Sequence, residues 1–241
     1  MEPDYVDIDL VLESAPGQYV PAEYHQGARG KPGYRYVEAV DGVNWGIRVR
    51  NKSQRRVEIV ASVDGRDVQT GEAAKSEQRG LVISAGAETI IPGWRVDQNN
   101  VAKFVFKDDY SYAADSGDGN TANVGLVHVD VYKEYVTKRL LGEENTDYGY
   151  RLRSASAPQS KSIGTGFGAQ TTSRVGTTTF DRDPTSKAFQ TFRYDTAENL
   201  RLLGFSVEEK PPLPEDLLKR ENANPYPADT QYCRPPADWK G

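Results

Sequence analysis

Short runs of alternating apolar and polar residues follow one another through the middle of the sequence, and they constrain the fold more than any other feature. In the run from Val127 to Val131, valines alternate with His128 and Asp130. Such alternation places the apolar side chains on one face of an extended strand. Turn residues separate these runs at the spacing typical of sandwiches. The sequence therefore predicts an all-β fold built on an antiparallel β-sandwich, jelly-roll-like or immunoglobulin-like.

Turn residues also predict how neighbouring strands are joined. Residues 45–50 and 57–63 are expected to pair as a hairpin, and Asp64-Gly65 is a strong signal for a tight turn. Ala85-Gly86 predicts another turn. Further strands are expected over residues 81–84, 88–91, 102–106 and 127–132. Six or seven strands of this kind suffice for a two-sheet core.

Shifts in composition divide the chain into four parts. Residues 1–43 are interpreted as an N-terminal strand, over residues 5–13, followed by an extended arm rich in glycine and proline. Residues 44–136 form the predicted sandwich core. Residues 137–205 are expected to hold a long loop, late strands and a short helix packed on the core. Residues 206–241 are interpreted as a proline-rich C-terminal arm.

Local signals after residue 136 predict a few further elements. Residues 177–180 and 189–194 are candidates for two late strands. A short helix is expected over residues 197–203, with Asp195 or Thr196 as its N-cap and Gly204 as its stop. A second helix is predicted over residues 214–220, because proline and acidic residues open it and basic residues close it.

Composition narrows the class of protein. Hydrophobic residues make up 37% of the 241 residues, so part of the chain is expected to lie outside a core. The net charge of −5 comes from interspersed acidic and basic residues, which argues against nucleic-acid binding. The acidic start of the chain does not resemble a signal peptide, and no run of 18 apolar residues predicts a membrane span. The single cysteine cannot form an intrachain disulfide.

The aromatic residues of the two arms are candidates for contacts with other chains. The sequence holds 14 tyrosines against 7 phenylalanines, and tyrosine combines an apolar ring with a polar tip that suits interfaces. The lone cysteine either has no special role, or it forms an interchain disulfide or is buried at a subunit contact. The predicted interaction residues are Tyr19, Tyr24, Tyr34, Tyr226, Tyr232, Cys233 and Trp239.

Several sequence blocks, in this order, resemble an uncharacterised family of proteins encoded in bacterial genomes. The blocks are VEIVASVDGRDVQTG from Val57, IPGWR from Ile91, VAKFVF from Val101, SYAA from Ser111, NVG from Asn123, GTGFG from Gly164 and RYDTAENL from Arg193. The resemblance spans about residues 45–205. It implies one integrated unit, and it implies no activity, because none is known for the family.

None of the polar clusters in the sequence predicts an active site or a cofactor. The glycine-rich run at residues 164–168 lacks the strand and helix of a nucleotide fingerprint and is interpreted as a flexible turn. His128 and Asp130 share a strand face, which in principle positions an imidazole for base catalysis, but a polar outer sheet face is the simpler interpretation. Asp115, Asp118 and Asn120 offer oxygen ligands for Ca²⁺ in a loop that lacks EF-hand spacing, so a solvated turn is preferred.

These features favour a non-enzymatic structural subunit of a large assembly. A virion protein is the most concrete form: a capsid decoration, a minor capsid protein or a tail-associated protein, made in the cytoplasm. Its partners are expected to be other protein subunits, as a homo-oligomer or in lattice contacts. The alternative is a soluble module of the bacterial cytoplasm that binds a ligand or a protein near the loop of residues 108–120.

Overall fold

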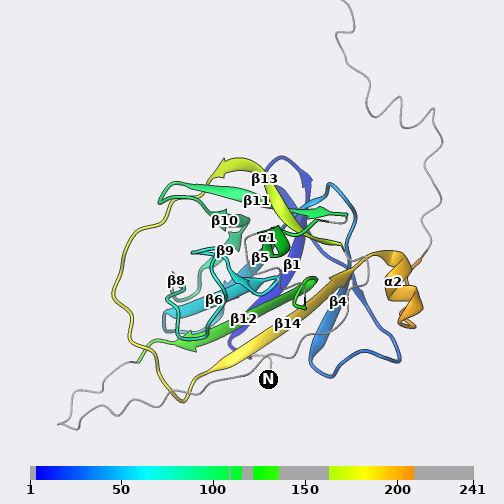
Figure 1. Cartoon of the computed structure of the whole chain (residues 1–241). Helices are drawn as coiled ribbons and strands as arrows, with labels where there is room; N and C mark the ends of the chain where they lie inside the picture. The colour runs from blue at the N-terminus through cyan, green and yellow to red at the C-terminus, as the bar shows by residue number, and fades with distance from the viewer. Residues whose placement is uncertain (1–3, 109, 116–121, 136–162, 209–241) are drawn as a thin grey trace, which may run out of the picture. The chain divides into compact units, whose positions relative to one another are not determined.

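A computed structural model describes residues 4–108, 110–115, 122–135 and 163–208, and within them the strands form two seven-stranded sheets (Figure 1). These residues belong to one compact unit, Met1–Val207, apart from Glu208. The predicted β-sandwich is thereby confirmed. The predicted helix at residues 214–220 lies outside the described residues.

Sheet A runs in the order β10-β11-β5-β1-β2, with β13 paired to β11 and β9 paired to β5. All of its pairs are antiparallel. Its strands are β1 (Val6–Ala15), β2 (Gln18–Pro21), β5 (Asn44–Asn51), β9 (Glu88–Ile91), β10 (Gly93–Arg95), β11 (Asn100–Lys107) and β13 (Gly164–Thr172).

Sheet B runs in the order β3-β4-β14-β12-β6-β7, with β8 paired to β6. The pairing of β14 with β4 is parallel, so this sheet is mixed, whereas the prediction was purely antiparallel. Its strands are β3 (Tyr24–His25), β4 (Tyr34–Glu38), β6 (Val57–Val63), β7 (Arg66–Asp67), β8 (Leu81–Ile83), β12 (Leu126–Lys133) and β14 (Ala188–Asp195).

The core lies between the two sheets and is rich in aromatic rings. Trp45 of β5 stacks on Phe104 and Phe106 of β11, with ring centroids 4.7 and 5.3 Å apart. Tyr194 of β14 approaches Phe106 from the opposite sheet at 5.0 Å. Burial of such side chains contributes about 1.5–3 kcal/mol each. The valines of β12 also face this core, as their alternation predicts.

The two short helices lie near the ends of strands. α2 (Ala197–Leu202) confirms the prediction, because the Thr196 side chain accepts a hydrogen bond from the Asn199 amide at 3.2 Å and Gly204 follows with φ +81°. This is the geometry of an N-cap and a glycine stop. α1 (Tyr112–Asp115) is a single turn that contacts β13.

The predicted hairpin of residues 45–50 and 57–63 is wrong, because β5 and β6 belong to different sheets. The chain turns a corner at Asn51, whose buried amide group donates to the carbonyls of Arg55 and Ser84 at 2.9 Å each. The same carboxamide oxygen accepts from the Ser53 amide at 2.9 Å. The later turn at residues 84–87 likewise joins β8 of sheet B to β9 of sheet A.

Three other expectations are corrected by the strand assignments. The residues interpreted as an N-terminal arm supply β2, β3 and β4, so much of that segment is part of the sandwich. The run at residues 164–168 opens β13 and is not a turn. Residues 177–180 have no strand pairing, whereas the strand expected at residues 189–194 is confirmed as β14.

Candidate functional site

A cleft of about 820 Å³ is lined by β8 of sheet B and β9 of sheet A, two strands that follow one another in the sequence. A further wall is the first part of the connection between β13 and β14, residues 173–181, which we call the strap. In Figure 1 this yellow segment bows outward past β8 before it returns toward β14. The volume falls in the range of ligand-binding clefts.

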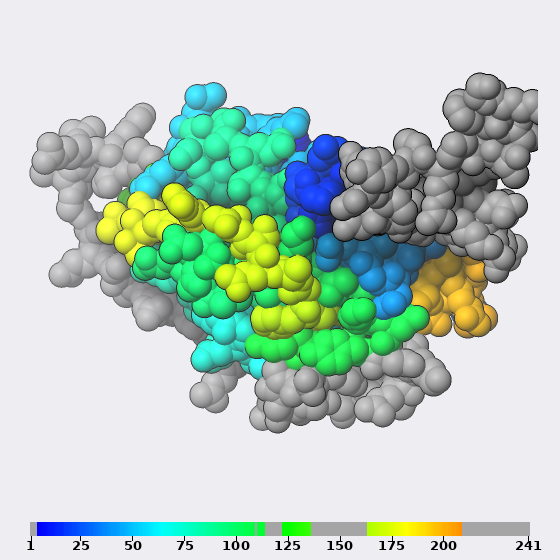
Figure 2. Space-filling model, turned by 90° about the horizontal axis from the view of Figure 1, so that it is seen from above, coloured from blue at the N-terminus to red at the C-terminus, as the bar shows by residue number. Residues whose placement is uncertain are grey.

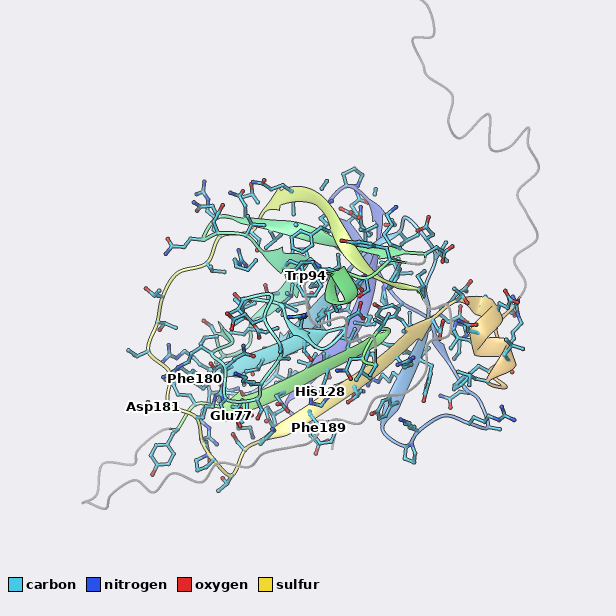
Figure 3. The ribbon with its side chains drawn as sticks, in the orientation of Figure 1. Glu77, Trp94, His128, Phe180, Asp181 and Phe189 are labelled. Atoms are coloured by element: carbon cyan, nitrogen blue, oxygen red, sulfur yellow. The ribbon has the colours of Figure 1, made fainter. Side chains whose placement is uncertain are left out.

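The strap is fixed at both ends. At its start, the Ser173 amide donates to the Asn99 carbonyl at 2.7 Å, and Val175 makes a similar bond at 2.9 Å. At its end, Phe180 is buried against sheet B, and Figure 3 shows Phe180 and Asp181 where the strap returns to that sheet. A side chain at Gly176, near the middle, would meet no atom within 4 Å. The strap is thus anchored at both ends, and the space around the Cβ position of Gly176 is empty.

Three of the charged residues that line the cleft are acidic, and two of these are neutralised by arginines. Glu58 accepts from Arg182 at 2.6 Å, and Glu88 accepts from Arg50 at 2.6 Å. Neither of these arginines lines the cleft. The third acid, Asp181, is exposed at the end of the strap.

The three arginines of the cleft are Arg79, Arg95 and Arg174, and none makes a salt bridge within the described part of the chain. Arg79 donates to the Phe180 carbonyl at 2.9 Å. Arg95 donates to the Ser173 hydroxyl at 3.3 Å and also to the Ser173 carbonyl. Among the acidic residues that line the cleft, only Asp181 has no arginine partner, so the lining holds more positive than negative charge; outside the lining, Asp97 also attracts Arg95.

Arg95 is the most unusual of these residues. Its Nε is buried and has no hydrogen-bond partner among the described residues. Burial lowers the pKa of its guanidinium, since a charged group loses hydration there. The residue as a whole is half-buried, and the nearby Asp97 carboxylate opposes part of this lowering of the pKa. An added anion stabilises such a partly desolvated cation further.

The alternative binding site near the loop of residues 108–120 is not supported by this cleft, because none of the described residues of that loop, 108 and 110–115, lines it. Asp118 and Asn120 of the candidate Ca²⁺ loop lie outside the described residues. Asp115 ends α1. Among the described residues, no group of three or more His, Cys, Asp or Glu side chains is arranged to hold a metal ion.

His128 and Asp130 meet on the outer face of sheet B, as their alternation predicts. Nε2 of His128 lies 3.3 Å from Asp130 Oδ1, and Nδ1 lies 2.9 Å from the hydroxyl of Thr191. Lys187 pairs with the other Asp130 oxygen at 3.2 Å. Burial raises the pKa of Asp130, but the bond from His128 and the charge of Lys187 outweigh it, so the pKa is lowered overall.

This cluster differs from a catalytic triad in its access to substrate. Thr191, the hydroxyl nearest the imidazole, is only 4% exposed. Both nitrogens of His128 are engaged, and the exposed ring of Phe189 lies 5.4 Å from the imidazole (Figure 3). The arrangement joins β12 to β14 across the sheet surface.

The tyrosines predicted as interaction residues divide between packing and regions outside the described residues. Tyr24 accepts from the Leu10 amide at 3.1 Å and donates to Asp9 at 3.2 Å, and burial raises its pKa to about 12. Tyr34 lies beside Tyr36 on β4, and Tyr19 is half-buried on β2. Tyr226, Tyr232, Cys233 and Trp239 lie outside the described residues.

A buried carboxylate, Asp64, forms a second polar cluster that sequence reasoning missed. Its Oδ1 accepts from the Tyr194 hydroxyl at 2.6 Å and from the Gly125 amide at 2.9 Å. Its Oδ2 accepts from the Ser111 hydroxyl at 2.8 Å and from the Thr165 amide at 2.9 Å. Desolvation raises the pKa of Asp64, and these four hydrogen bonds oppose the rise only in part.

The donors around Asp64 explain what several of the family-like sequence blocks do. Asp64 belongs to the first block, and the blocks SYAA, NVG, GTGFG and RYDTAENL each supply one of its donors. Asp64 and Gly65 form the predicted tight turn, with φ +52° and +81°. Because the carboxylate is enclosed, the cluster ties distant segments together and is not open to a ligand.

Comparison of the chain with models of protein families, with curated proteins and with solved structures found no match. The family resemblance of the sequence blocks therefore stays a prediction. Within the described residues, neither helix has the length and apolar character needed to cross a membrane.

Proposed function

We propose that this protein is a non-enzymatic structural subunit of a large protein assembly, most concretely a virion component such as a capsid decoration, a minor capsid protein or a tail-associated protein. The proposal is supported by the outer edge of sheet A. This edge is formed by β13, which within the described residues pairs only with β11.

The β13 edge lacks the features that keep sheet edges from pairing with other chains. Its nine residues include no charged residue and no proline. From Phe167 onward the strand is largely exposed, and Phe167 itself is 46% exposed. In Figure 2 this strand runs across the visible surface. An exposed, uncharged edge strand offers its backbone groups to a strand of another chain.

Three other outer strands, β2, β3 and β7, are protected by contrast. β2 has four residues and ends at Pro21, and β3 and β7 have two residues each. Short edge strands and edge prolines are devices that prevent sheets from joining. Among these four strands, the difference supports β13 as the edge through which neighbouring subunits would extend the sheet.

A charge on the β13 edge tests the proposal. We expect light scattering after size exclusion to show that the wild-type chain associates and that Ala169→Lys shifts it to the monomer, because an edge lysine disfavours strand pairing. Ala85→Lys, in an exposed turn, is the matched control and should associate like the wild type. A wild-type chain that stays monomeric and is absent from the source's purified particles would refute the proposal.

A further inference from the structure

Two strand ends with unpaired edges face the cleft. Within the described residues β8 pairs only with β6, and β9 pairs only with β5. Residues of both strands line the cleft, opposite the strap. A peptide in extended conformation can add to such an edge through main-chain hydrogen bonds, while alternate side chains enter neighbouring pockets.

Apolar side chains are available for such a peptide along the same walls. Leu81 and Val82 of β8, Ile90 of β9 and Val175 of the strap all line the cleft and are only partly buried. Their remaining exposed surface would be covered by small apolar side chains of a bound segment. Each buried methylene group contributes about 0.8 kcal/mol.

The charges of the cleft define the polar side chains that the segment needs. Arg79, Arg95 and Arg174 make no salt bridge among the described residues, although Asp97 attracts Arg95 from outside the cleft, and Glu58 and Glu88 are already paired. Arg95 of β10, whose Nε has no hydrogen-bond partner among the described residues, contacts the start of the strap through Ser173. A carboxylate bound by arginine forms a charge-assisted, often bidentate hydrogen bond.

We propose that the cleft binds an extended acidic segment of a partner protein, which passes beneath the strap and alternates carboxylate with apolar side chains. The segment adds to the edge of β8 or β9, and its carboxylates pair with Arg95 and with one or both of Arg79 and Arg174. This inference is independent of the β13 edge, so its failure and the failure of the assembly proposal are separable.

The test uses the full chain and a labelled peptide that alternates glutamate and valine over about six residues, the usual length of a strand. We expect fluorescence anisotropy to show saturable binding that weakens as salt rises. Arg95→Gln should weaken binding about tenfold, because a hydrogen bond to a charged group is lost. Arg79→Gln and Arg174→Gln change exposed residues, so at least one of them should weaken binding even if the Arg95 variant folds poorly.

Matched controls separate this site from general charge attraction. Lys107→Gln removes an exposed cation that does not line the cleft, and Ala169→Lys changes the β13 edge; both should bind the peptide like the wild type. The inference is overturned by any of three results: no saturable binding, equal binding of a lysine–valine peptide, or equal binding of an oligogalacturonate. Tighter binding of a peptide made from residues 208–221 would assign the cleft to this chain's own tail and would also overturn it.

Discussion

Removal of the Asp64 carboxylate tests whether this buried cluster holds the sandwich together. In Asp64→Ala the amides of Gly125 and Thr165 lose their acceptor in a buried environment. Each unsatisfied amide costs about 1–3 kcal/mol, so the two together cost about 2–6 kcal/mol. Alanine at the left-handed backbone conformation of residue 64 adds about 1 kcal/mol. The Tyr194 hydroxyl keeps Thr165 as a partner at 2.6 Å and contributes little to the loss.

Asp64→Asn separates hydrogen bonding from charge. Its amide oxygen replaces one carboxylate oxygen, and its NH₂ group can donate to the hydroxyl of Ser111 or of Tyr194. Because one backbone amide then faces this NH₂ group, we expect a loss of about 1–3 kcal/mol, less than for alanine. Asparagine also tolerates the positive φ.

Urea unfolding followed by tryptophan fluorescence measures these losses, because Trp45 and Trp94 are both buried in the core. Asp41→Asn is the control: Asp41 is exposed, its ion pair with Lys107 is 4.0 Å long, and its loss should cost no more than about 1 kcal/mol. A free energy of unfolding for Asp64→Ala within about 0.5 kcal/mol of the wild type would contradict the role given to the cluster.

The pH dependence has a sign fixed by the raised pKa of Asp64. A folded-state pKa above the unfolded value means that the native state binds the proton more tightly, so this group's contribution to stability rises as pH falls through the folded pKa toward 3.8. The stability advantage of the wild type over Asp64→Asn should therefore increase over that window.

Two further predictions concern the sheets. Gly93→Ala places a Cβ 1.9 Å from the Ala102 carbonyl oxygen, so β10 must move away from β11, and the free energy of unfolding should fall by about 2–3 kcal/mol. Gly176→Ala, whose Cβ would lie in open space, is the control and should change the free energy of unfolding by less than about 0.5 kcal/mol. Equal effects of the two substitutions would contradict the close approach of β10 and β11. Asp130→Asn should lower stability at neutral pH by about 1 kcal/mol. Because the pKa of Asp130 is lowered in the folded state, its contribution to stability is present above pH 3.8 and is lost as pH falls through the folded pKa. In urea unfolding, the stability of the wild type should therefore fall more steeply in acid than that of Asp130→Asn. Parallel pH curves for the two proteins would rule out this stabilising role of the Asp130 carboxylate.

Alternation predicted which residues face the core more successfully than it predicted which strands are neighbours. Phe104 and Phe106 of β11 and the valines of β12 face the core as expected, since period two is a local property of an extended chain. The partner of a strand depends on the corner that follows it. The buried carboxamide of Asn51 makes such a corner, and nothing in the local pattern distinguishes it from a hairpin turn.

Strands of low hydrophobicity were missed for a related reason. β13 has three glycines, and its side chains pack by small size and close approach: a Cβ at Gly164 would lie 2.5 Å from the Tyr110 carbonyl oxygen. β4 is held by a parallel partner more than 150 residues later in the chain. The cleft was equally hidden, because its walls come from residues 58–95 and 173–181 and meet only in the folded chain.

The position of β14 has a consequence for how the protein is made. This strand lies between β4 and β12, so sheet B stays in two pieces on the ribosome until residues 188–195 emerge. Until then one edge of β12 is open, and β3 and β4 have no attachment to the rest of that sheet. Pairings so distant in sequence slow folding and expose strand edges to aggregation. During synthesis there is therefore an interval in which the open edge of β12 and the unattached strands β3 and β4 are exposed to aggregation. The interval ends when β14 emerges and completes the sheet.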